Sequence, residues 1–149
     1  MDSGSNIILT NDIGLLRDVK DIKPFAISVA LNGESTLDDY CTKQGLLTLT
    51  RDDGKHFDVT CYYCSNATET IISPQAIVTE SPIFTKWTQV GYKDPAMPGK
   101  VQFSNINDTV TMTITLTYNN GLYYCHSDRY RNAGNPTVLR TAHGPITKA

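Results

Sequence analysis

The stretch Val110-Thr111-Met112-Thr113-Ile114-Thr115-Leu116-Thr117 alternates strictly between an apolar residue and a threonine. Because successive side chains of a β-strand point to opposite faces, this pattern predicts a strand with one buried and one solvated face. Asn119-Asn120-Gly121 supplies a hairpin turn directly after it. Residues 100–103 and 121–125 predict two further strands, so a small β meander is expected over residues 100–128.

Earlier in the chain, an apolar run and a turn signal predict a first hairpin. Residues 25–31 are apolar, and Asn32-Gly33 after them strongly favours a tight two-residue turn. The return strand is expected over residues 35–41.

A second hairpin is expected over residues 46–64. Asp52-Asp53-Gly54 is its turn, and the alternation in the returning strand places Phe57, Val59 and Cys61 on one face.

A short helix interrupts the strands after this hairpin. Thr70-Ile71-Ile72 is expected to be a short buried strand, and the helix follows over residues 73–78. Ser73 suits the N-cap position and Pro74 the first helical position, since proline lacks the N–H that a helix start leaves unpaired.

The overall expectation is therefore a mainly β fold divided into parts. Three prolines, Pro82, Pro95 and Pro98, favour loop structure in the middle of the chain. The expected division is a β unit over residues 1–79, a linker over 80–99, the meander over 100–128, and a polar, flexible tail over 129–149.

Composition excludes several functions. The chain has 149 residues, of which 40% are hydrophobic and 19% charged, with a formal net charge of −2. Lysine and arginine are scattered, which disfavours nucleic-acid binding by this segment. No apolar run reaches the roughly 18–20 residues of a membrane span, and the start lacks the features of a signal peptide. An intracellular, cytoplasmic location is expected.

Catalytic chemistry is suggested by Asp2-Ser3-Gly4, followed by Ser5. An Asp can act as a general acid and base, a neighbouring hydroxyl can fix the loop, and Gly lets backbones approach closely. The alternative is a turn that merely caps the following segment. The nearest second copy, Asp108-Thr109-Val110, lacks the Gly, so a working site would need two chains.

The order and spacing of several motifs resemble a known family. Residues 2–78 resemble the protease region of copia-type retrotransposon polyproteins, a branch of the retropepsin-like aspartic proteases. Residues 99–125 resemble the spacer that precedes integrase in such polyproteins. The first resemblance is carried by Asp2-Ser3-Gly4-Ser5, by Pro24 to Ala30, by Gly45 with its alternating strand, and by Thr70-Ile71-Ile72-Ser73. Ser73 stands where Gly is usual in retropepsins.

The resemblance implies a retropepsin-like closed β-barrel unit with a flap hairpin and one short helix. It also implies a segment before the catalytic Asp, so with only Met1 before Asp2 the protease domain is expected to be N-terminally truncated. The implied partners are a second copy of the chain, as a homodimer, and the polyprotein as peptide substrate. No metal or cofactor is implied, and the cytoplasmic location extends to virus-like particles.

In the implied mechanism, Asp2 faces the Asp2 of its partner and the two carboxylates share one proton while activating water. Ser3, Gly4 and Ser5 support the active-site loop. The implied flap comprises Val29, Ala30, Leu31, Asn32 and Gly33, and the implied substrate pocket or barrel wall includes Ile71 and Ile72. The alternatives are an ordinary hairpin without a lid role and, for the whole chain, a non-catalytic β-rich scaffold or binding domain.

Four cysteines leave a separate question open. Cys61, Cys64, Cys125 and His126 could complete a zinc site, although adjacent ligands on a strand point to opposite faces. A redox disulfide is a second possibility. The favoured interpretation is that the cysteines are small, buried, apolar side chains.

Overall fold

The computed structural model describes residues 7–31, 35–67, 69–94, 96–119, 122–127, 137–141 and 146–148. Over these residues the protein is mainly β, with one α-helix, α1 (Pro74–Glu80), and a short 3₁₀ turn at Ile13–Leu15. The strands are β1 (Leu9–Thr10), β2 (Arg17–Leu31), β3 (Ser35–Thr50), β4 (His56–Tyr63), β5 (Ile71–Ile72), β6 (Lys86–Val90), β7 (Gly99–Ser104), β8 (Thr111–Asn119), β9 (Leu122–Ser127), β10 (Thr137–Thr141) and β11 (Ile146–Lys148).

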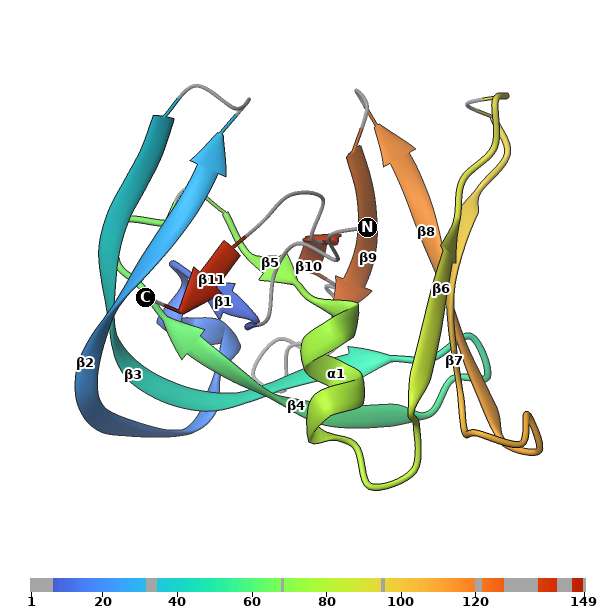
Figure 1. The fold of residues 1–149 in the computed structure, drawn as a ribbon, viewed down its shortest axis with the longest axis horizontal. Coiled ribbons are helices and arrows are strands. Elements are labelled where there is room, and N and C mark those ends of the chain that lie inside the picture. Colours follow the sequence, from blue (N-terminus) through green and yellow to red (C-terminus); the bar gives the residue numbers. More distant parts are fainter. Residues whose placement is uncertain are drawn as a thin grey trace.

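Hydrogen bonding connects the described strands in the order β11-β2-β3-β4-β1-β5-β10-β9-β8-β7-β6 (Figure 1). They fall into two sheets that meet at β8, which pairs with β7 on one side and β9 on the other. The order has two ends, β11 and β6, so the described strands do not close into the expected barrel. Alternation in a sequence tells which face of a strand is buried, but it does not tell whether two distant edges meet.

Both predicted hairpins are present in the described residues. β2 pairs with β3 up to Leu31↔Ser35, and the turn expected at Asn32-Gly33 lies outside those residues. The second turn is described: Arg51 N–H donates to the Lys55 carbonyl at 2.8 Å, and Gly54 adopts φ +85°. This left-handed backbone is the conformation that favours glycine, so the prediction of a turn at this place is confirmed.

α1 begins where the sequence predicts. Ser73 is its N-cap, with Oγ accepting the Ala76 N–H at 3.0 Å, and Pro74 occupies the first turn. The helix extends two residues beyond the expected end and stops at Glu80, where the Ser81 N–H bonds the Ile77 carbonyl.

Three strands lie where the sequence predicts linker or tail. β6 occupies part of the expected linker and pairs with β7 along five residues. β10 inserts between β5 and β9, and β11 pairs with β2, although residues 129–149 are expected to be a flexible tail. These strands are stabilised by pairing with segments far away in the sequence. Local composition therefore could not predict them.

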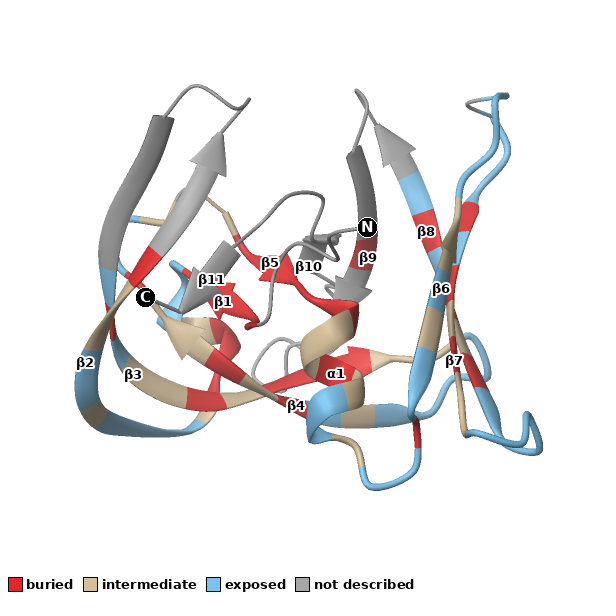
Figure 2. Ribbon diagram, viewed as in Figure 1, coloured by how far each residue is buried: buried red, intermediate tan, exposed pale blue. Residues whose placement is uncertain are grey.

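Two apolar clusters make up the core, and Figure 2 shows buried residues gathered in β1 and β5 between them. The smaller cluster lies where β1 and β5 meet β2 and β3, and it includes Ile7, Leu9, Ile27, Cys41, Cys64 and Ile71. The larger one contains residues of β3 and β4 together with residues of β7 and β8, among them Leu47, Leu49, Val59, Phe103, Ile114 and Leu116. The expected first unit and the expected meander therefore share one core.

Candidate functional site

The expected catalytic loop precedes the first residue that the structure describes. Asp2, Ser3, Gly4 and Ser5 lie outside the described residues, which begin at Ile7. From that point the chain is tightly held, because Ile7, Ile8 and Leu9 are all buried.

β1, which follows the motif, is bonded on both edges. It pairs in parallel with β4 and antiparallel with β5. The Tyr62 N–H donates to the Ile8 carbonyl and the Cys64 N–H to the Thr10 carbonyl, both at 2.9 Å. A two-residue strand is seldom rigid by itself, but two bonded neighbours and a buried position fix this one.

A buried pair of hydroxyls links β1 to the segment before β5. Thr10 Oγ1 and Thr70 Oγ1 are 2.6 Å apart, and Thr10 Oγ1 also accepts the Asp12 N–H at 3.0 Å. Thr10 is fully buried and Thr70 nearly so. Sixty positions separate the two threonines, and no spacing pattern could have identified them as partners.

Ile71 and Ile72, expected to line a substrate pocket or the barrel wall, are both buried. Ile71 belongs to the smaller cluster and Ile72 to the larger one, as their alternation on β5 requires. β5 therefore joins the two clusters directly before α1 begins.

Of the expected flap, Val29, Ala30 and Leu31 lie in β2 opposite residues 35–37 of β3. Asn32 and Gly33 are outside the described residues. In Figure 1 this end of the β2–β3 hairpin extends beyond β4, the next strand in the sheet. This geometry is compatible both with a flap and with an ordinary hairpin.

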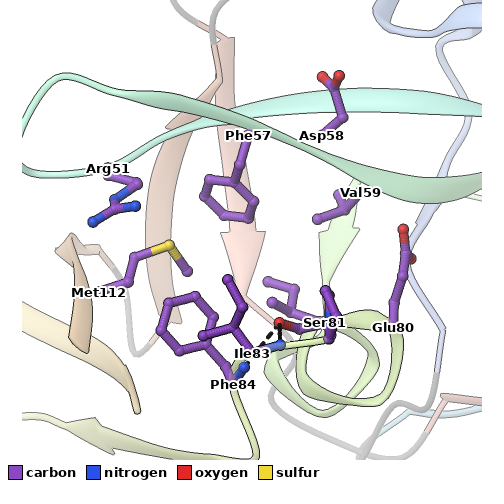
Figure 3. A pocket seen from close by; sticks show the side chains of 11 residues that line it. Arg51, Phe57, Asp58, Val59, Glu80, Ser81, Ile83, Phe84 and Met112 are labelled. Carbon is purple, nitrogen blue, oxygen red and sulfur yellow. Dashed lines mark hydrogen bonds between the residues drawn. The ribbon is translucent and has the colours of Figure 1, made fainter. Parts of the chain in front are cut away.

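An apolar cavity of about 310 Å³ lies between β4, α1, the segment after α1, and β8 (Figure 3). Phe57, Phe84 and Met112 point toward one another across it. Ser81 Oγ accepts the N–H groups of Ile83 and Phe84, at 3.1 and 2.9 Å, and so fixes the wall that follows α1. The sequence predicts Phe57 on the same face of its strand as Val59 and Cys61, but nothing in the alternation predicts a cavity there.

Charged groups at the edge of the cavity are engaged with other parts of the protein. Asp58 accepts the Thr48 hydroxyl at 2.7 Å and pairs with Arg17. Burial alone would raise the pKa of Asp58, but these hydrogen bonds and the Arg17 charge hold it below its usual range. Glu80 accepts the N–H and the hydroxyl of Thr60 at 3.1 to 3.2 Å, which ties the end of α1 to β4.

The cysteines lie in two different places. Cys61 and Cys125 belong to the larger cluster, whereas Cys41 and Cys64 belong to the smaller one. Burial raises the pKa of Cys61, helped by the neighbouring Cys41, and raises the pKa of Cys125 to about 12. Such thiols hold their protons at neutral pH while no metal is bound. The arrangement matches the interpretation as buried apolar side chains.

Two further observations concern the described residues alone. They contain no group of three or more His, Cys, Asp or Glu side chains arranged to hold a metal ion. None of their helices has the length and the apolar character that crossing a membrane requires.

Comparison with protein-family models, curated proteins and solved structures finds no match to this chain.

Proposed function

We propose that this chain is the aspartic endopeptidase unit of a copia-type retrotransposon polyprotein, with a retropepsin-like arrangement of β1 to β5 and α1. One observation carries the proposal. The Asp2-Ser3-Gly4 motif is followed within a few residues by a strand that is buried and hydrogen-bonded on both edges. A catalytic carboxylate needs such a rigid support, because misplacement by about 1 Å can slow a reaction by roughly a hundredfold.

The chemistry of this proposal needs two chains. Asp2 of each protomer faces the other across a two-fold axis, and two carboxylates about 3 Å apart cannot both be ionised. They share one proton, so the ionised member takes a proton from water while the protonated member polarises the scissile carbonyl. The roles then exchange as the leaving amine receives its proton.

The β2–β3 hairpin is the flap of this proposal. An extended polyprotein segment lies beneath it, paired through its backbone, and closure of the flap excludes water from the dyad. Val29, Ala30 and Leu31 supply the β2 side of that lid.

Cleavage of an unfolded protein tests the proposal. The recombinant chain is incubated with reduced, denatured casein between pH 4 and 7, and new amino termini are counted. We expect an acidic optimum near about pH 5, and a loss of at least about a hundredfold in Asp2→Asn, which removes the shared proton.

Asp18→Asn is the matched control for this experiment. Its carboxylate is 73% exposed and its φ is 51°, a backbone conformation that Asn also accepts. This variant should cleave casein like the wild type. Equal rates for Asp2→Asn and wild type, or no cleavage by the wild type, would favour the non-catalytic scaffold instead.

A further inference from the structure

The expected protease unit and the expected spacer are in contact through both apolar and polar groups. We infer that residues 7–80 and residues 99–127 are binding partners of each other, so that a cut between β6 and β7 leaves the two products joined. The inference deepens the proposed function, since polyproteins are cut between their segments, but the contacts themselves do not depend on it.

The apolar contact is the larger cluster of the core. Leu47 and Leu49 of β3 lie in it with Phe103 of β7 and Leu116 of β8, and all four side chains have no exposed surface. Separation of the two parts would bring these side chains into contact with water on both sides. Contiguous apolar faces of this kind drive association.

A polar contact is made by Asp52, in the turn between β3 and β4. Its N–H donates to the Thr113 carbonyl at 2.9 Å. Its carboxylate accepts both the N–H and the hydroxyl of Thr115, each at 2.7 Å. β9 pairs with β8 only from Thr117 onward, so Asp52 takes the place of a strand partner along the preceding edge of β8.

β6 adds a second polar contact and a backbone contact. Trp87 Nε1 donates to Gln75 Oε1 of α1 at 3.1 Å. This hydrogen bond links β6 to residues 7–80. β6 also pairs with β7 along five residues. After a cut beyond β6, this strand would stay in the first product and remain hydrogen-bonded to the second.

The loop between β6 and β7 can be cut without touching these contacts. Its described residues, 91–94 and 96–98, are all exposed. Tyr92 and Met97 are 45% and 47% exposed, and neither belongs to the core clusters.

The test is a nick in the full chain. A recognition sequence for an added site-specific protease is inserted between Lys93 and Asp94, and the cut chain is passed over a sizing column. We expect both fragments in one peak at the position of the uncut protein. We also expect Trp87 fluorescence and far-UV circular dichroism to report one coincident urea transition. Fragments that elute apart or precipitate would overturn the inference. Because the added protease makes the cut, the result is independent of any peptidase activity of the chain.

A pair of variants tests the contact made by Asp52. Asp52→Ala removes both hydrogen bonds of the carboxylate. We expect the dissociation constant of the two fragments, measured without urea, to be about tenfold larger in this variant than in the wild type. Asp53→Ala is the matched control, because it alters the same exposed turn and, among the residues that the structure describes, Asp53 bonds only Lys55 and Arg51. A complex weakened in Asp52→Ala but not in Asp53→Ala supports the inference. Equal dissociation constants in the two variants would overturn the role of Asp52.

Discussion

Ser73 is the N-cap of α1 and therefore fixes where the helix starts. The retropepsin-like proteases that the sequence resembles usually carry Gly at the corresponding position, and Ser and Gly both serve as N-caps. With φ at −106°, the backbone of Ser73 is open to any residue, so Ser is accommodated without strain and its Oγ caps the Ala76 N–H.

Two small substitutions at Ser73 should lower the stability of the protein by unequal amounts. Ser73→Ala should lower the free energy of unfolding by about 1 kcal/mol, whereas Ser73→Gly should lower it by only a few tenths. Urea denaturation monitored by circular dichroism measures both values. Equal losses would mean that the hydroxyl does not act as a cap.

The buried thiol of Cys125 should make the stability of the protein depend on pH. Burial raises its pKa from an ordinary 9.0 to about 12 in the folded protein, so between these values the folded chain holds a proton that the unfolded chain has lost. The free energy of unfolding should therefore fall as the pH rises from about 9 to 12, by at most about 1.4 kcal/mol per pH unit for this group. Cys125→Ala should make the fall shallower in urea titrations at each pH. An identical slope in the variant would contradict the burial of the thiol.

Among the elements, β3 depends on a residue without a side chain. A Cβ at Gly45 would lie 2.9 Å from both the Arg17 carbonyl oxygen and Leu16 Cβ, and Leu16 is buried and unable to give way. Gly45→Ala should therefore lower the free energy of unfolding by about 1–3 kcal/mol, as overpacking does. A lower urea midpoint with an unchanged slope would show it. Thr42→Ala, at an exposed site on the same strand, is the control and should leave the midpoint in place.

The elements that the sequence predicts well are those with a local cause. Threonine alternation identifies β8, Asp52-Asp53-Gly54 identifies the second turn, and Ser73-Pro74 identifies the start of α1. β6, β10 and β11 escape such reasoning, because distant partners rather than local residues make them strands. The same holds for the Thr10–Thr70 pair near the candidate site.

At the scale of the whole molecule, sequence reasoning divides the chain where the structure joins it. The prolines of residues 80–99 favour a linker, yet Val101, Phe103 and Leu116 share a core with Leu47 and Leu49. The composition of residues 80–99 describes only that connecting segment. It does not tell whether the apolar faces of the strands before and after it pack against each other. The expected closed barrel was wrong for a related reason. The local sequence of β11 and β6 does not tell whether these two edge strands pair, and in the described strands they do not.

The proposed site needs two molecules. If each catalytic centre takes one Asp2 from each protomer, a dimer that contains a single Asp2→Asn chain cannot form the carboxylate dyad. The most direct test is to unfold wild-type and Asp2→Asn chains together, refold them in varied ratios, and measure casein cleavage near pH 5. Activity per chain should follow the square of the wild-type fraction, so an equal mixture retains about a quarter of the wild-type value. Activity proportional to the wild-type fraction, about a half in that mixture, would contradict a site shared between two chains.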